Sequence, residues 1–131
     1  ESFFEDLPVR LNQAHLVICR AGASTVAELA TAGRPSILIP YPSAIDDHQS
    51  ANGAALSRTG GAILMHEGQT TAKILSKQLT KVFMNPDMLS STAYAALKLG
   101  RSNASKALAD IVENLALLKQ LPDSAANESS A

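Results

Sequence analysis

The chain has 131 residues, a length that suits a single domain able to bury a hydrophobic core. Hydrophobic residues make up 46% of it and charged residues 18%, which excludes an intrinsically disordered chain. The formal net charge of −1 and the aromatic content of 4% argue against broad nucleic-acid binding, which needs a basic face and stacking platforms. The single cysteine excludes an intrachain disulfide framework, and no apolar run approaches the roughly 20 residues of a membrane span.

Three short apolar runs rich in aliphatic residues predict β-strands at residues 15–19, 36–40 and 61–65. None alternates cleanly between polar and apolar residues, which is typical of strands covered on both faces of a parallel sheet. Helix-length segments separate the runs, so βαβ units with right-handed crossovers are expected. The sequence therefore predicts an α/β fold, a Rossmann-like parallel sheet flanked by helices. A fourth strand is expected to end at residues 2–4.

Capping residues and apolar spacing predict the helices. Asp6 is expected to cap the first one, with Pro8 in its first turn. Gly33 is expected to end the second helix. The other signals predict helices over about 24–32, 47–58, from Thr70 or Thr71 to the break at Asn85-Pro86, 86–99 and 102–120. The small, polar residues 122–131 predict a disordered tail.

The first candidate site spans residues 20–28, which follow a predicted strand and enter a helix. Free backbone N–H groups and the dipole at a helix start favour an anion, most often a phosphate. Gly22 would allow close approach, Ser24 and Thr25 offer hydroxyl groups, and Glu28 has the chemistry to accept two hydrogen bonds from a ribose diol. The alternative is a capping box formed by Ser24 or Thr25 with Glu28, which needs no ligand.

The second candidate site spans residues 40–52 and gathers seven polar side chains: Ser43, Asp46, Asp47, His48, Gln49, Ser50 and Asn52. In a helix, either His48 or Gln49 shares a face with Asn52. Neutral amides and an imidazole on one face suit a neutral polyhydroxylated ligand such as a sugar. The alternative is a proline-rich loop with Asp46 or Asp47 as an ordinary N-cap. No metal site is predicted, because adjacent residues rarely converge on one ion.

Two further features favour structural roles. Cys19 is flanked by apolar residues, so a buried small hydrophobe is favoured over a nucleophile. Lys73, Lys77 and Lys81 recur every four residues, which is typical of a solvated helix face, with a weak contact to anionic lipid as the alternative.

The two motifs together resemble the C-terminal half of the MurG family, bacterial glycosyltransferases that add N-acetylglucosamine to lipid I and so make lipid II for peptidoglycan. The resemblance covers residues 3–115 and implies the GT-B fold, in which two Rossmann-like domains enclose the active site. Residues 1–121 would be the C-terminal domain, which binds the UDP-N-acetylglucosamine donor. Because the chain starts at Glu1 in mid-pattern without Met, it is expected to be a piece of a longer protein that also contains the N-terminal acceptor domain.

The resemblance also implies which residues bind the donor. The backbone near Phe4 would read the uracil edge, residues 23–25 would hold the diphosphate, and Glu28 would bind the ribose hydroxyls. Contacts to the sugar would come from the segment 48–52, and loop-length variation in the family leaves open whether His48 or Gln49 makes the main one. Many relatives carry a His where Ser43 stands here. The full set of implied residues is Phe4, Ala23, Ser24, Thr25, Glu28, His48, Gln49 and Asn52.

The implied reaction is an inverting transfer that needs neither metal nor cofactor: the C4 hydroxyl of the acceptor attacks the anomeric carbon, and UDP leaves. The general base, the lipid I site and the main membrane contact are expected in the N-terminal domain. The family acts peripherally at the cytoplasmic face of the bacterial inner membrane. This chain alone is expected to bind UDP weakly and to catalyse no transfer. Alternatives are the small subunit of a split UDP-N-acetylglucosamine transferase, a non-catalytic Rossmann-like module and, less favoured, a UDP-sugar epimerase.

Overall fold

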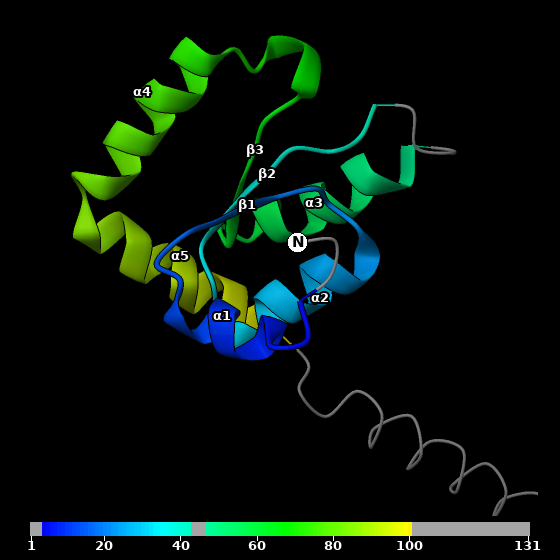
Figure 1. Cartoon of the computed structure of the whole chain (residues 1–131), viewed down its shortest axis with the longest axis vertical. Coiled ribbons are helices and arrows are strands. Elements are labelled where there is room, and N and C mark those ends of the chain that lie inside the picture. The colour runs from blue at the N-terminus through cyan, green and yellow to red at the C-terminus, as the bar shows by residue number, and fades with distance from the viewer. Residues whose placement is uncertain (1–3, 43–46, 101–131) are drawn as a thin grey trace, which may run out of the picture. The chain divides into compact units, whose positions relative to one another are not determined.

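The computed structural model describes residues 4–42 and 47–100 as one sheet surrounded by helices (Figure 1). The strands β1, β2 and β3 are parallel and lie in that order across the sheet. In chain order the elements are α1 (Leu7–Gln13), β1 (Val17–Cys19), α2 (Ala23–Ala32), β2 (Ser36–Leu38), α3 (His48–Arg58), β3 (Ala62–Leu64), the 3-10 helix η2 (Glu67–Gln69), α4 (Ala72–Phe83) and α5 (Pro86–Leu99). The predicted α/β class with a parallel sheet is confirmed.

The central strand β2 shows why the sequence of each strand is apolar without alternation. All three of its residues are buried, because helices cover both of its faces and strands flank both of its edges. The register places Ile37 between Ile18 and Ile63, and Leu38 between Cys19 and Leu64. Ile18 is 44% exposed, since β1 lies at the edge of the sheet. Each strand spans three of the five predicted residues.

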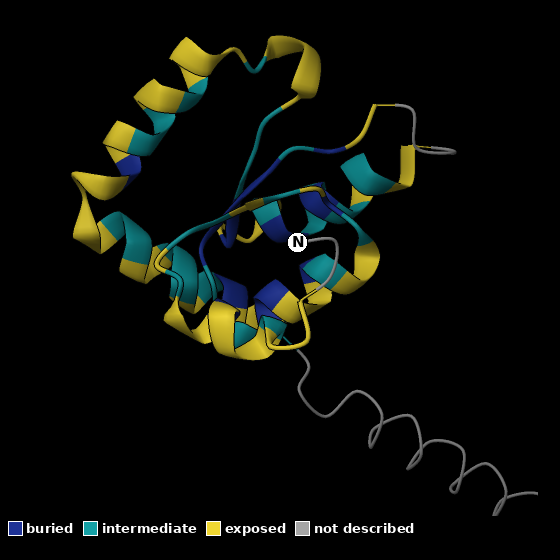
Figure 2. Ribbon diagram, viewed as in Figure 1, coloured by how far each residue is buried: buried dark blue, intermediate teal, exposed yellow. Residues whose placement is uncertain are grey.

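The hydrophobic core lies between the sheet and the helices α2, α3 and α5 (Figure 2). Leu29 of α2, Leu38 of β2 and Leu56 of α3 are fully buried there. Burial of a leucine side chain stabilises a fold by roughly 1.5–3 kcal/mol. Ala96 joins the same cluster from α5. On the other side of the sheet, Ile63 lines a small cavity together with residues of α4 and α5.

Most predicted helix ends are confirmed. Gly33 ends α2 in the left-handed conformation, with φ of 61°. Thr71 caps α4 because its hydroxyl oxygen accepts a hydrogen bond from the Ile74 N–H at 3.3 Å. Asn85 caps α5 in the same way, through the Met88 N–H at 3.1 Å. These local hydrogen bonds satisfy N–H groups that the helix itself leaves without partners.

The prediction for Asp6 is wrong in one respect. Asp6 occupies the N-cap position of α1, but its side chain makes no capping hydrogen bond. Its carboxylate instead accepts a hydrogen bond from Arg10 Nε at 2.7 Å, an ion pair across one helical turn. That hydrogen bond holds the pKa of Asp6 below its usual value.

Several predictions concern the first four residues and the residues after position 100. Phe4 lies outside any strand, and residues 1–3 of the expected fourth strand lie outside the described residues. The same holds for the predicted helix 102–120 and the predicted tail 122–131. None of the helices in the described part of the chain has both the length and the hydrophobicity to cross a membrane.

Candidate functional site

The carboxyl ends of the three strands bring together segments that are far apart in sequence. Because the strands are parallel, residues 20–22, 39–42 and 65–67 all leave the sheet on the same side, the carboxyl edge that is formed by the C-terminal ends of the strands. Open α/β sheets bind ligands beyond this edge. Both motifs singled out in the sequence begin here, at the starts of α2 and α3.

The start of α2 is not capped by a side chain. Gly22 occupies the N-cap position, and the first hydrogen bond of the helix runs from the Val26 N–H to the Gly22 carbonyl oxygen at 2.9 Å. Ser24 and Thr25 lie inside the first turn, so the alternative of a capping box with Glu28 is wrong. The N–H groups of residues 23–25 precede the first helical hydrogen bond, so this helix end offers backbone donors at the sheet edge.

Glu28 and Phe4 lie on one groove, although 24 positions separate them in the sequence. The groove has a volume of about 690 Å³ and lies between α1 and α2, where Leu7, Leu11 and Thr31 also line it. Such a volume is within the roughly 300–1,000 Å³ typical of small-molecule sites. Both Phe4 and Glu28 are exposed to solvent. The structure therefore supplies an apolar groove with a carboxylate at its wall, lined by residues from the second half of α2.

The amides of Gln49 and Asn52 reach the same edge from α3. The Tyr41 backbone N–H donates to Gln49 Oε1 at 2.9 Å, and Asn52 Nδ2 donates to the Ala21 carbonyl oxygen at 3.4 Å. Each amide is thus tied to the backbone of a segment that follows a strand. Its other half carries the opposite hydrogen-bonding character: an NH₂ donor on Gln49 and a carbonyl acceptor on Asn52.

His48 is the first residue of α3 and is exposed. Asp47 occupies the N-cap position with φ of 55°, yet its side chain makes no capping hydrogen bond. The alternative of an ordinary aspartate cap is therefore wrong for Asp47. Asp46 and Ser43 lie outside the described residues.

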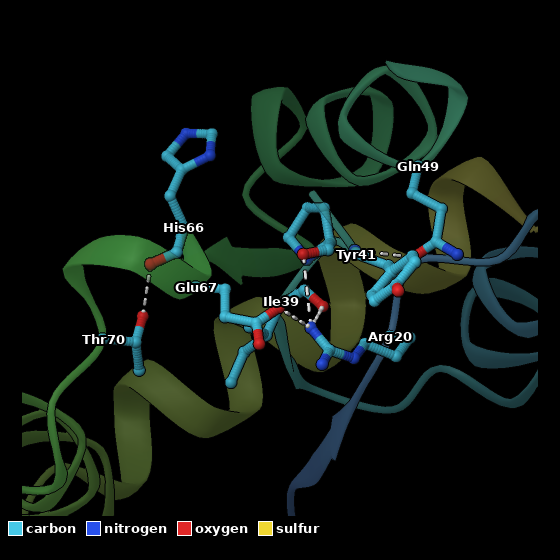
Figure 3. A network of polar contacts seen from close by, with 8 residues as sticks. Arg20, Ile39, Tyr41, Gln49, His66, Glu67 and Thr70 are labelled. Atoms are coloured by element: carbon cyan, nitrogen blue, oxygen red, sulfur yellow. Dashed lines mark hydrogen bonds and ion pairs between the residues drawn. The ribbon is translucent and has the colours of Figure 1, made fainter. Parts of the chain in front are cut away.

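A polar network that the sequence did not predict joins all three strand ends (Figure 3). Arg20 Nη1 donates to the carbonyl oxygens of Ile39 at 3.2 Å and Pro40 at 3.3 Å, and to Glu67 Oε2 at 2.7 Å. The hydrogen bond from Arg20 holds the pKa of Glu67 below its usual value, and that to Glu67 raises the pKa of Arg20. The sequence feature that could have indicated this contact is the position of the two residues, because both follow strands that end at the carboxyl edge of the sheet.

Cys19 lies beside this network at the end of β1 and packs against the core. Its burial raises the pKa of the thiol to about 11. A thiol with that pKa is protonated at neutral pH, and the thiolate is the nucleophilic form. The structure thus favours the predicted structural role of Cys19.

Comparison with known proteins places this geometry in a family. Residues 1–115 match the model of the glycosyltransferase family 28 C-terminal domain. Two similar proteins bear the name "UDP-N-acetylglucosamine--N-acetylmuramyl-(pentapeptide) pyrophosphoryl-undecaprenol N-acetylglucosamine transferase". The one from Paramagnetospirillum magneticum is 55% identical over 115 residues, which are 88% of this chain and 31% of that protein. The one from Rhodospirillum centenum is 50% identical over 125 residues, 93% of this chain and 33% of that protein.

A solved structure agrees with these relatives. The crystal structure of Acinetobacter baumannii MurG superimposes with a TM-score of 0.77 at 38% sequence identity, covering 86% of this chain and 32% of that one. The chain therefore spans about a third of the length of the curated relatives that it matches. The fold, the strand-end site and the match over residues 1–115 lead to one conclusion: this chain belongs to glycosyltransferase family 28, as a C-terminal domain of that family.

Proposed function

We propose that this chain is the donor-binding domain of a transferase that moves N-acetylglucosamine from UDP-N-acetylglucosamine to lipid I, forming lipid II. The observation that carries the proposal is the uncapped start of α2, which lies at the carboxyl edge of the sheet, on the same helix that contributes Glu28 to the groove of Phe4. The two relatives described above, both named as N-acetylglucosamine transferases, share this part of the sequence at 50% and 55% identity.

Gly22 supports a ligand at this helix end. Its φ is −61°, which any residue adopts, and an added Cβ would meet only Thr25 Oγ1, at an ordinary 3.6 Å. Neither backbone conformation nor packing among the described residues requires glycine there. A diphosphate that approaches the backbone N–H groups closely would require it, since a side chain at the N-cap would crowd the anion.

The groove between α1 and α2 supports the nucleoside. A carboxylate is the natural partner of a ribose diol, because each of its oxygens accepts a hydrogen bond from one hydroxyl. Glu28 is exposed at the wall of the groove, one turn and a half beyond the start of α2. Phe4 lies on the same groove, where its backbone groups would reach the uracil edge.

The role of each group in the reaction follows from the charge that develops as the donor is cleaved. The C4 hydroxyl of the acceptor attacks the anomeric carbon with inversion, and the bond to the UDP oxygen breaks. Negative charge develops on the departing diphosphate, where the N–H groups of residues 23–25 and the α2 dipole stabilise it. Gln49, Asn52 and His48 orient the sugar. The acceptor site, the general base and the principal membrane contact would lie in an N-terminal domain, at the cytoplasmic face of the inner membrane.

Titration calorimetry with UDP tests the proposal on two variants. Gly22→Ala should lower the free energy of unfolding by no more than about 1 kcal/mol, since alanine is a poorer N-cap than glycine, and should weaken UDP binding by roughly 10-fold or more, about the loss of one charge-assisted hydrogen bond. Gly68→Ala is the matched control, because nothing lies within 4 Å of its added Cβ. UDP affinity that is equal in both variants would contradict a diphosphate at α2.

Glu28→Gln tests the ribose contact. This variant should weaken UDP by roughly 10-fold and leave 2′,3′-dideoxyuridine diphosphate unaffected, because that ligand offers no diol to the carboxylate. An equal loss for both nucleotides would place Glu28 elsewhere. Absence of UDP binding by the unsubstituted protein would instead favour the alternative of a non-catalytic Rossmann-like module.

A further inference from the structure

Arg20 supplies hydrogen bonds that the sheet itself does not provide. The last ladder bonds run from the Ile39 N–H to the Cys19 carbonyl at 2.9 Å and from the Met65 N–H to the Leu38 carbonyl at 2.9 Å. Beyond them the chain leaves the sheet at Ile39 and Pro40, whose carbonyl oxygens both accept from Arg20 Nη1. Backbone carbonyls that lose their ladder partners need such donors.

The guanidinium is itself held in place from the third strand. Glu67 begins η2, just after β3, and its carboxylate accepts from Arg20 Nη1 at 2.7 Å. All three acceptors share the two hydrogens of Nη1, so one end of the guanidinium joins Ile39, Pro40 and Glu67. Arg20 is thereby fixed between the ends of β2 and β3.

The same segment carries the anchor of Gln49. Arg20 lies 5.5 Å from the centre of the Tyr41 ring, and the Tyr41 N–H donates to Gln49 Oε1 at 2.9 Å. Figure 3 shows the resulting chain of contacts from Glu67 through Arg20 to Tyr41 and Gln49. The placement of the Gln49 amide therefore depends on backbone that Arg20 holds.

We propose that Arg20 is a positioning residue for the sugar of the donor, acting through Tyr41 on Gln49, with Glu67 as its anchor. The inference rests on the proposed function for the identity of the ligand. It assigns Arg20 no contact with the diphosphate, although an arginine so close to α2 invites that assignment. The two roles differ in what they predict for UDP, which lacks the sugar.

The test uses Arg20→Gln combined with Glu67→Gln, which removes one charge of each sign and keeps the net charge constant. The ion pair is about half exposed, with side chains 47% and 44% accessible, so the fold should survive its loss. Hydrogen exchange at the Tyr41 N–H should accelerate by roughly 10-fold, because its backbone is released. Arg58→Gln, at the exposed end of α3, is the matched control and should leave this exchange rate unchanged.

Calorimetry gives the second readout. The double variant should bind UDP-N-acetylglucosamine roughly 5–10-fold more weakly, while UDP affinity stays within about twofold. In a Gln49→Ala background the additional loss should vanish, because the two changes act through one contact. Glu67→Gln alone, which keeps Arg20, should shift both readouts in the same direction and serves if the double variant does not fold.

Three results would overturn the proposal. Unchanged Tyr41 exchange would show that Arg20 does not hold the segment. Equal losses for UDP and UDP-N-acetylglucosamine would place Arg20 on the diphosphate, and losses additive with Gln49→Ala would separate Arg20 from Gln49. A failure of the proposed function would give a different result. Hydrogen exchange at the Tyr41 N–H would still accelerate in the double variant, but the unsubstituted protein would bind neither nucleotide. Arg20 would then hold the segment of Ile39 and Pro40 without positioning a sugar.

Discussion

The short link between α3 and β3 carries two adjacent glycines that face different constraints, and this difference gives a quantitative prediction. Gly61 is buried, and an added Cβ would lie 2.8 Å from Ala96 Cα and 2.9 Å from Ala96 N. Ordinary contact begins at 3.4 Å, so the backbone of α5 would have to retreat by about 0.6 Å. Gly60 has φ of 81°, but its added Cβ would lie a comfortable 3.8 Å from Ala95 Cβ.

The cost therefore has different origins at the two positions. Gly61→Ala overpacks the contact between β3 and α5 and should lower the free energy of unfolding by about 2–3 kcal/mol. Gly60→Ala strains only the backbone, and should cost about 1 kcal/mol after the gain from a stiffer unfolded chain. Gly68→Ala meets neither constraint and should stay within about 0.5 kcal/mol of the parent.

Urea unfolding followed by far-UV circular dichroism measures all three variants on one scale. In a thermal scan, Gly61→Ala should melt about 10–20 °C below the parent, as expected for a domain of this size. A Gly61→Ala variant no less stable than Gly60→Ala would refute the reasoning, because it would mean that α5 does not pack against the start of β3 at this distance.

Two other predictions concern the helix starts and the thiol. Asn85→Ala should lower the free energy of unfolding in urea by about 1 kcal/mol, because it removes the cap of α5. Ser24→Ala should change it by less than about 0.5 kcal/mol, because Ser24 caps no helix. Equal losses in the two variants would show that Ser24 does cap α2. The pKa of Cys19 is raised to about 11, so its alkylation rate should keep rising with pH through 9 and 10 instead of levelling near 9. Because the folded pKa lies above the unfolded value of 9.0, the contribution of this thiol to stability is complete below pH 9 and is lost as the pH rises toward 11.

Local chemistry made much of the fold predictable. The αL glycine at Gly33 and the caps at Thr71 and Asn85 depend on neighbours three or four residues away, so the sequence displays them directly. The failures at Asp6 and Ser24 are local too, and concern the choice between alternatives within one helical turn. A side chain suited to capping has other partners available, and Asp6 takes Arg10 instead.

The candidate site was predictable by residue type and less so by connection. Glu28 and Gln49 were identified because carboxylate and amide chemistry at a strand-to-helix turn suggests a ligand. That Gln49 binds the Tyr41 backbone, and Asn52 that of Ala21, depends on where α3 packs against the ends of β1 and β2. Spacing along one helix carries no information on that placement.

By itself, then, the sequence determined the parallel α/β class and the two strand-to-helix turns, because apolar runs, glycine and capping residues act within a few positions of themselves. The tertiary structure decided which groups meet at the sheet edge. Arg20 and Glu67 are 47 residues apart and pair only because the parallel strands β1 and β3 end at the same edge on either side of β2. Phe4 and Glu28 share a groove only because α1 packs beside α2. Contacts of this kind follow from the register and packing of whole elements, which no local pattern encodes.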